Sequence, residues 1–165
     1  MAAVTQATAA VSIEAVDPLH AQALALLGQA AIEARALYPE LFGSASPPPT
    51  NLPLRPRETY LLTWRDGRAI GCGALRQHDA FTGEVGRMFV TRSARREGVA
   101  RALLERLEQA ALAFGYRQLV LETGSRQAAA IALYSGCGWR RIAAFGPYIG
   151  DATSVCFGKS LGARR

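Results

Sequence analysis

The sequence predicts a single mixed α/β domain, in which strands alternate with helices and the first strands form an antiparallel meander. The chain has 165 residues, which is within the usual size of one domain. Half of the residues are hydrophobic and 19% are charged, so the chain can build a core and is not a mainly disordered protein. The spacing of apolar residues switches between the period of strands and the period of helices. We expect the domain to span residues 11–165, after a flexible tail over residues 1–10.

The first third of the chain is expected to contain a strand, a helix and a long loop. Residues 12–16 alternate apolar and polar side chains, as a short strand does. Asp17 is a suitable N-cap and Pro18 suits the first helical position, so a helix is predicted from there to about Leu37. Residues 41–57 carry a glycine and several prolines, which prevent a regular helix or a central strand. A loop of this length in a compact domain is either a functional segment or simply disordered.

Three strands follow, and they are expected to pair as an antiparallel meander. Residues 59–65 are rich in strand-forming side chains, and residues 69–75 resume the pattern after an Asp-Gly turn. A second break at residues 81–83 leads into a third strand over residues 84–90. We expect the functional site to begin at this third strand.

The second half of the chain is expected to alternate helices with strands. From Val99 onward apolar side chains recur at helical spacing on one face, which predicts an amphipathic helix that ends at Gly115. A buried strand over residues 118–122 comes next. The remaining candidates are a helix over residues 127–137 and strands over residues 139–145 and 154–158.

Charge and cysteine content limit the class of protein. There are 19 Lys and Arg against 13 Asp and Glu, a net charge of +6, so an anionic partner such as a nucleic acid or a phosphorylated cofactor is plausible. The three cysteines lack CxxC spacing, which favours neither a disulfide framework nor a metal site and fits a reducing cytoplasm. No apolar run is long enough to span a membrane, and the first residues lack the basic start of a signal peptide.

The strongest local signal is the segment over residues 95–100, between the third meander strand and the amphipathic helix. Backbone N–H groups at a helix N-terminus can face an anion, and Arg95 and Arg96 add positive charge. Gly98 allows close approach of the backbone, and Ala100 keeps the next position small. Neither a P-loop nor a dinucleotide-binding glycine motif is present. The segment therefore predicts a pyrophosphate site, with an ordinary loop-to-helix junction as the alternative.

The spacing Arg95-x-x-Gly98-x-Ala100 resembles the signature of the GNAT superfamily of N-acetyltransferases. The likeness continues over residues 84–90, the Leu-Leu pair of the following helix, residues 121–123 and residues 130–139, which is roughly the C-terminal half. The resemblance implies an acyl-CoA N-acyltransferase fold, with a twisted, mostly antiparallel mixed sheet flanked by helices. It also implies one parallel pairing, beside which a bulge opens a V-shaped slot for the cofactor.

The resemblance implies acetyl-CoA as the co-substrate and no metal. The loop would bind the pyrophosphate, and the strand end would pair with the pantetheine arm like an added strand. Gln127 stands where the family often has asparagine. The cofactor-binding residues implied in this way are Met88, Phe89, Val90, Arg95, Arg96, Glu97, Gly98, Val99, Ala100, Arg101, Gln127, Ala130 and Tyr134.

Acetyl transfer to an amine requires a deprotonated amine, a polarised carbonyl and a stabilised thiolate. The resemblance implies that Tyr134 is the general acid at the cofactor sulfur and that the backbone N–H near Val90 polarises the thioester carbonyl. Glu84 is the provisional base, because some family members use a glutamate placed this way. The alternatives are a core aromatic role for Tyr134, a solvated Glu84 or one paired with Arg87, and Glu122 as the active carboxylate.

The acceptor is expected to be a primary amine on a small molecule or peptide. Within the family it binds mainly at the first helices, the following loop and the C-terminal strands. Candidate acceptor residues there are Tyr38, Phe42, Arg55, Arg57 and Tyr148, and the arginines favour an acceptor with a carboxylate over a polycation. A non-catalytic acetyl-CoA sensor is the main alternative function. Nucleic-acid binding is disfavoured because the arginines are scattered, membrane association is not expected, and a homodimer stays open.

Overall fold

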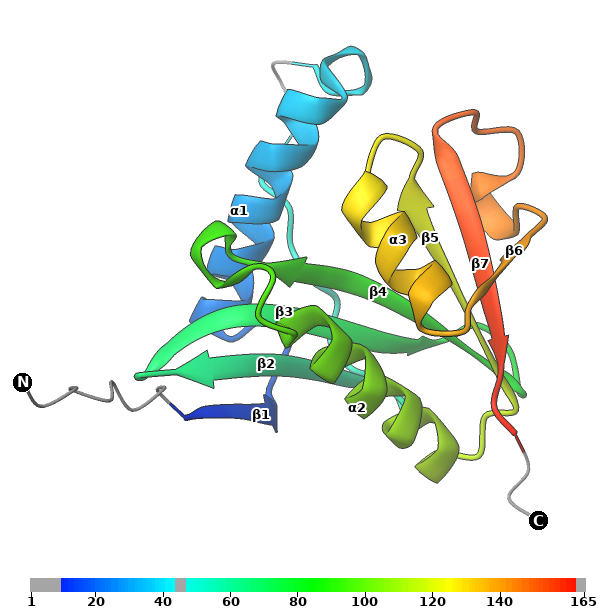
Figure 1. Cartoon of the computed structure of the whole chain (residues 1–165), viewed down its shortest axis with the longest axis horizontal. Coiled ribbons are helices and arrows are strands. Elements are labelled where there is room, and N and C mark those ends of the chain that lie inside the picture. The colour runs from blue at the N-terminus through cyan, green and yellow to red at the C-terminus, as the bar shows by residue number, and fades with distance from the viewer. Residues whose placement is uncertain (1–9, 44–46, 163–165) are drawn as a thin grey trace, which may run out of the picture.

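The computed structural model describes residues 10–43 and 47–162, and there it forms one mixed α/β domain around a single sheet (Figure 1). The sheet contains seven strands within these residues, in the order β1-β2-β3-β4-β5-β7-β6. All neighbours pair antiparallel except β4 and β5, which are parallel. The predicted fold class is therefore confirmed. Of the tail expected over residues 1–10, all but Ala10 lies outside the described residues.

The strands and helices follow the predicted order. The strands are β1 (Val11–Ala15), β2 (Thr59–Arg65), β3 (Arg68–Gln77), β4 (Thr82–Val90), β5 (Gln118–Gly124), β6 (Arg140–Ile142) and β7 (Ser154–Ser160). The α-helices are α1 (Ala21–Leu37), α2 (Val99–Ala113) and α3 (Ala128–Gly136). Short 3-10 turns are η1 (Pro39–Leu41), η2 (Arg92–Ala94) and η3 (Gly146–Tyr148).

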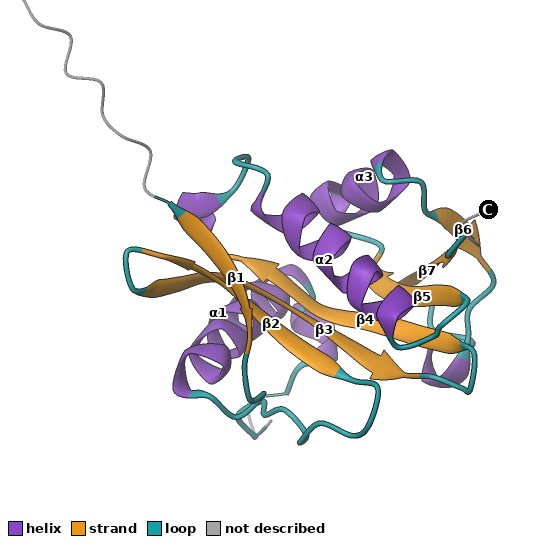
Figure 2. Ribbon diagram, turned by 90° about the horizontal axis from the view of Figure 1, so that it is seen from below, coloured by secondary structure: helices purple, strands orange, loops and turns teal. Residues whose placement is uncertain are grey.

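The helices cover both faces of the sheet, with α1 on one face and α2 and α3 on the other (Figure 2). The larger core lies under α2 and α3, where Leu103, Leu104 and Leu107 are fully buried against the sheet. A smaller core lies under α1 around Leu26, Tyr60 and other buried residues. Within the described ranges no helix has both the length and the apolar character needed to cross a bilayer.

The feature that positions the site is the irregular end of β4. The register between β3 and β4 shifts between Cys72 and Ala74, and the bulged residue Arg87 has a left-handed φ of 57°. β4 pairs with β5 only over residues 82–85. Beyond that the two strands diverge toward their C-terminal ends, as Figure 1 shows. This is the bulge and V-shaped slot that the family resemblance implied.

Two predicted element limits differ from the structure by more than two residues. α1 begins at Ala21, with the His20 imidazole accepting a bond from the Gln22 N–H at 3.0 Å. Asp17 instead accepts from the Leu19 N–H at 2.8 Å, so its carboxylate closes a turn before the helix and does not cap it. The strand expected over residues 139–145 is only three residues long, because β6 pairs with β7 at the sheet edge over residues 140–142 alone.

Candidate active site

A pocket of about 380 Å³ opens where β4 and β5 separate, and we call it the slot pocket. Its walls come from the C-terminal end of α1, from β4, β5 and α3, and from the segment that precedes β7. Eight of the residues proposed from the sequence line it: Tyr38, Phe42, Met88, Glu122, Gln127, Ala130, Tyr134 and Tyr148. The structure therefore brings together the predicted acid, part of the predicted cofactor set and most of the predicted acceptor set.

The backbone at the end of β4 is open on the side of the slot. The Thr91 N–H donates to the Ile70 carbonyl of β3 at 2.8 Å. Because successive residues of a strand direct their backbone groups to opposite edges, the Val90 N–H faces away from β3. β5 leaves this edge unpaired, since its pairing with β4 ends at Val85. The Val90 carbonyl accepts a bond from the Nε of Arg95 at 3.0 Å, which ties the strand end to the following loop.

The loop before α2 has the backbone geometry of an anion cradle. Arg96 and Gly98 are both left-handed, with φ of 64° and 82°, immediately before the first turn of the helix. A side chain at Gly98 would meet no atom within 4 Å, so the space beside it is open. Val99, by contrast, is buried in the core, and only its backbone can serve a ligand.

The charged residues of this loop divide into two groups. Arg95 pairs with Glu33 of α1 at 2.6 Å, and Glu97 pairs with Arg65 at 2.6 Å, so these side chains fasten the loop to the body of the domain. Arg96 and Arg101 are exposed and make no ion pair with any described residue. These two are the positive charges that remain available for a phosphate group.

Tyr134 lies in the wall of the slot pocket on the α3 side. Its ring packs on Phe157 and Trp139, with ring centroids 5.8 and 6.0 Å away. Burial raises the pKa of Tyr134 to about 12, and the negative charge of Glu122 adds to the rise. The phenol therefore stays protonated through neutral pH, as a proton donor must. Its hydroxyl donates to no other described residue, so both the core role and a donor role are compatible with this position.

Two half-buried carboxylates, Glu84 and Glu122, lie on the adjacent strands β4 and β5, and Glu122 lines the slot pocket. Burial raises the pKa of Glu84, and the nearby His78 opposes this shift. Burial also raises the pKa of Glu122, a bond from the Ser154 hydroxyl at 3.0 Å lowers it, and the charges of Asp151 and Glu84 raise it further. Within the described part of the chain Glu84 makes no ion pair with Arg87, so the pairing considered from the sequence does not form.

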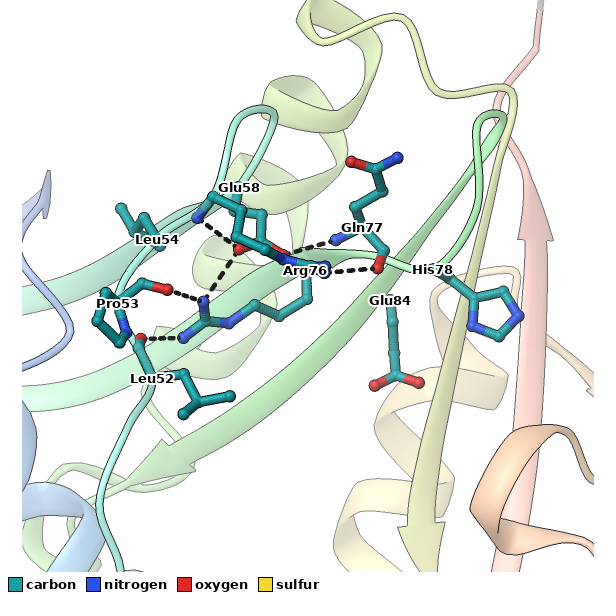
Figure 3. A pocket seen from close by; sticks show the side chains of 9 residues that line it. Leu52, Pro53, Leu54, Glu58, Arg76, Gln77, His78 and Glu84 are labelled. Carbon is teal, nitrogen blue, oxygen red and sulfur yellow. Dashed lines mark hydrogen bonds and ion pairs between the residues drawn. The ribbon is translucent and has the colours of Figure 1, made fainter.

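A second pocket, of about 680 Å³, is lined by residues 52–55, Glu58, the end of β3 and Glu84. We call it the loop pocket. Figure 3 shows the Glu84 carboxylate outside the hydrogen-bond network of this pocket, with the His78 ring nearby. Glu84 thus contributes to the wall of this pocket, while its neighbour Val85 lines the slot pocket.

Glu58 organises the loop pocket, and sequence reasoning did not find it. Its side chain is fully buried and binds the guanidinium groups of Arg55 and Arg76, each at 3.1 Å. It also accepts from the backbone N–H groups of Arg55 and Gln77, at 2.7 and 3.0 Å. Burial alone would raise the pKa of Glu58, but these four bonds lower it to about 2. No sequence pattern marks a glutamate for this role, because half of its bonds come from the end of β3, 18 and 19 positions away.

Three predicted acceptor residues have protein partners of their own. Arg55 forms an ion pair with Glu58, a carboxylate that it shares with Arg76. Arg57 donates to the Phe114 and Ala80 carbonyls and stacks 4.1 Å from the Tyr116 ring, so it has a structural role outside both pockets. The Tyr38 hydroxyl accepts from the Arg126 N–H at 2.8 Å, which joins the end of α1 to the turn before α3.

Comparison with known proteins gives a consistent family. Residues 29–139 match the model of the acetyltransferase (GNAT) family. An IAA acetyltransferase of Azospirillum brasilense is 43% identical over 108 residues, which cover 65% of this chain and 71% of that protein. The crystal structure of a Klebsiella pneumoniae protein of the acyl-CoA N-acyltransferase class superposes with a TM-score of 0.75 at 33% identity, covering 92% of this chain and 98% of that one.

A more distant structure has the same fold. It is a GNAT family acetyltransferase from Elizabethkingia anophelis with acetyl-CoA bound, with a TM-score of 0.65 at 17% identity, and the match covers 92% of this chain and 98% of that one. The family that the signature over residues 95–100 predicted is thereby confirmed. This chain belongs to the acetyltransferase (GNAT) family and is an acyltransferase enzyme.

Proposed function

We propose that this enzyme transfers the acetyl group of acetyl-CoA directly to a primary amine, with both substrates bound at once. The observation that carries the proposal is the open backbone edge of β4, which leads from the acidic wall at Glu84 to the loop before α2. A donor bound along this edge would meet an amine bound in the slot pocket. No covalent enzyme intermediate is needed, because attack by the amine on the thioester completes the transfer.

The residues of the slot fit acetyl-CoA. β5 does not pair with residues 86–90 of β4, so the backbone groups there that face away from β3, such as the Val90 N–H, suit an extended amide-containing arm. The left-handed residues Arg96 and Gly98 precede the free N–H groups of α2, and Arg96 and Arg101 supply positive charge for a pyrophosphate. When bound there, acetyl-CoA supplies the activated acetyl group.

On the acceptor side, Glu84 accepts a proton from the substrate ammonium, directly or through water. Its raised pKa brings the carboxylate nearer to the pH at which a general base works well. Glu122 adds a second negative charge close by, which holds the ammonium before it loses its proton.

On the donor side, the Val90 N–H donates to the thioester oxygen as negative charge develops there. Tyr134 donates its phenolic hydrogen to the departing sulfur. The C–N bond forms as the C–S bond breaks. The amine nitrogen loses two protons in all: the first passes to Glu84 before attack and is then released to solvent, and the second restores the phenolic proton that Tyr134 gave to the sulfur. The products are the amide, the CoA thiol and one released proton.

Substitution of Gly98 tests where acetyl-CoA binds. Acetyl-CoA at about 100 times its Kd should raise the Tm of the unmodified protein by roughly 5–10 °C, because it binds the native state alone. In Gly98→Glu this rise should vanish, since the new carboxylate occupies the anion cradle. Differential scanning fluorimetry of each protein, with and without acetyl-CoA, measures both effects.

Gly115→Glu is the matched control for this experiment. Gly115 also has a left-handed φ, 86°, and open space around it, but it lies at the opposite end of α2. Both variants therefore incur a similar backbone cost of about 1 kcal/mol. Gly115→Glu should keep the rise with acetyl-CoA. Equal loss of the rise in both variants would contradict a cofactor site at the loop before α2.

Substitution of Glu84 tests the base. Glu84→Gln should lower kcat/KM at neutral pH about 100-fold, because the amide cannot accept the ammonium proton. A base must be deprotonated to act, so the activity of the unmodified enzyme should fall as the pH drops through the raised pKa of Glu84. This fall is the acidic limb of the pH–rate profile, and Glu84→Gln should lack it. pH–rate profiles of Glu84→Gln and Glu122→Gln decide between the two carboxylates. Loss of the limb only in Glu122→Gln would move the role of base to Glu122.

The compartment is also part of the proposal. Cys72, Cys137 and Cys156 are all free thiols, and Cys72 and Cys156 are buried. Free thiols together with a CoA substrate support a reducing compartment such as the cytoplasm.

A further inference from the structure

Arg87 occupies an unusual position at the bulge of β4. It lines the slot pocket, as do Glu122 and Tyr148, and among the described residues no carboxylate pairs with it. Arg55 and Arg95 differ in this respect, because Arg55 forms an ion pair with Glu58 and Arg95 forms one with Glu33. The slot pocket therefore holds an arginine whose charge no carboxylate of the described residues compensates.

The guanidinium is held in place by uncharged partners. Its Nε donates to the Asn51 side-chain oxygen at 3.0 Å, and its Nη2 donates to the Thr50 carbonyl at 3.3 Å. Asn51 is buried, and its own Nδ2 donates to the Pro18 carbonyl at 2.9 Å, which turns the amide oxygen toward Arg87. These bonds orient the group without neutralising it.

The backbone at this position is strained. Arg87 has a φ of 57°, a conformation that costs most residues other than glycine roughly 1–2 kcal/mol. The bulge directs the backbone here away from the regular strand, into the wall of the slot. Such strain at a binding wall is typical of a position selected for where it places a side chain.

The charges of Glu84 and Glu122 affect the same part of the slot pocket as the charge of Arg87, namely the surroundings of Tyr148. Burial raises the pKa of Tyr148 to about 12, the charges of Glu84 and Glu122 add to the rise, and the charge of Arg87 opposes it. The Tyr148 phenol is thus within electrostatic reach of two carboxylates and one guanidinium. A ligand in this space meets a negative region and a positive group at once.

A guanidinium has more N–H donors than the two that Asn51 and Thr50 engage. The remaining donors on Nη1 and Nη2 form a planar fork, which matches the two oxygens of a carboxylate. Along β4, Arg87 follows Glu84 by three residues, so their Cα atoms are at most about 11 Å apart, the limit of a fully extended chain, and the bulge shortens this distance. Such a separation is on the scale of a small molecule that carries both charges.

We infer that the acceptor is an amino acid or a similar small amine with a carboxylate, and that Arg87 binds that carboxylate while the amine faces Glu84 and Glu122. This inference rests on the proposed function and adds the class of acceptor to it. A polyamine lacks a carboxylate for Arg87 to bind, and it would place a second positive charge close to the Arg87 guanidinium. Arg87 is therefore the residue that determines specificity.

The test compares amino acids with their primary amides as acceptors, because the amide keeps the amine and the shape but removes the negative charge. A panel of α- and ω-amino acids, the matched amides and polyamines is assayed for kcat/KM with the unmodified enzyme, Arg87→Gln, Arg87→Lys and Arg106→Gln. Arg106 is an exposed residue on α2 outside both pockets and serves as the control. Thermal unfolding of each variant verifies that it is folded.

We expect the unmodified enzyme to prefer the acids. Arg87→Gln should lower kcat/KM for the acids on the order of 10- to 100-fold, mostly through KM, while the values for the amides stay within about twofold. For Arg87→Lys, the kcat/KM for the acids should lie between the values of the unmodified enzyme and of Arg87→Gln, because lysine keeps the positive charge but lacks the planar fork of donors. Arg106→Gln should leave the ratio of acid to amide unchanged.

Each contrary result has a separate meaning. Equal losses for acids and amides in folded Arg87→Gln would assign Arg87 a structural role and overturn the inference. Equal use of amides, or preferred use of polyamines, by the unmodified enzyme would also overturn it while leaving acetyl transfer to amines in place. Absence of transfer to every amine on the panel, with acetyl-CoA binding intact, would overturn the proposed function and this inference together.

Discussion

Tyr134→Phe is expected to lower kcat about 100-fold while leaving the affinity for acetyl-CoA unchanged. The substitution removes only the hydroxyl that would donate to the departing sulfur, an effect in the range measured for single catalytic donors. The ring that packs on Trp139 and Phe157 stays in place. Because the hydroxyl bonds to no other described residue, the Tm should change little. Steady-state kinetics and calorimetric binding of acetyl-CoA measure the two quantities.

Tyr148→Phe is the companion variant. It removes a second slot-pocket phenol whose pKa burial also raises to about 12. Since Tyr148 is a candidate acceptor residue, its loss should act on the KM for the amine and not on kcat. Full turnover in Tyr134→Phe would contradict the acid role. Binding of acetyl-CoA without turnover by the unmodified protein, on a broad panel of amines, would instead favour a non-catalytic sensor.

Glu58→Gln is expected to reduce the free energy of unfolding at neutral pH by roughly 3 kcal/mol. The pKa of Glu58 is held at about 2 against an ordinary value of 4.5, and a tenfold change in proton affinity corresponds to about 1.4 kcal/mol. For a protein of this size the Tm should fall by roughly 6–12 °C. Urea unfolding at neutral pH gives the free energy, and a thermal scan gives the Tm.

The contribution of Glu58 to the free energy of unfolding should decrease as the pH falls. Because folding lowers the pKa of Glu58, its contribution is complete above the unfolded value of 4.5 and is lost as the pH falls toward about 2. The unmodified protein should therefore lose stability over this interval, and Glu58→Gln should have a flatter profile there. Parallel profiles for the two proteins would show that the Glu58 network contributes no linked stability.

An exposed ion pair provides the control for Glu58. Glu97 pairs with Arg65 at 2.6 Å, but the Glu97 side chain is half exposed, whereas that of Glu58 has no exposed surface. Exposed pairs contribute less than about 1 kcal/mol. Glu97→Gln should therefore change the Tm by only a few degrees. A loss equal to that of Glu58→Gln would mean that burial of Glu58 is not the source of its effect.

Local sequence was sufficient for most of the secondary structure. The strand over residues 59–65 was predicted with its observed limits, because strand-forming side chains end there at an Asp-Gly turn. The amphipathic stripe from Val99 to Ala111 predicted α2, since its apolar residues are those that the sheet buries. Both patterns involve residues within a few positions of one another in the chain, so they can be recognised without the tertiary structure.

The sequence by itself determined the family, through the spacing of Arg95, Gly98 and Ala100 beside a strand and a helix. Only the tertiary structure decided which charges are available in the site. Arg55 was proposed for the acceptor, but it pairs with the buried Glu58, whereas Arg87 was considered only as a partner of Glu84 and lines the slot without a carboxylate partner in the described chain. The physical reason is distance along the chain. Glu58 is only three positions from Arg55, but the strand that buries it and adds the bond from Arg76 is 18 positions away, and Arg87 bonds to Asn51 across 36 positions, so no local pattern encodes these contacts.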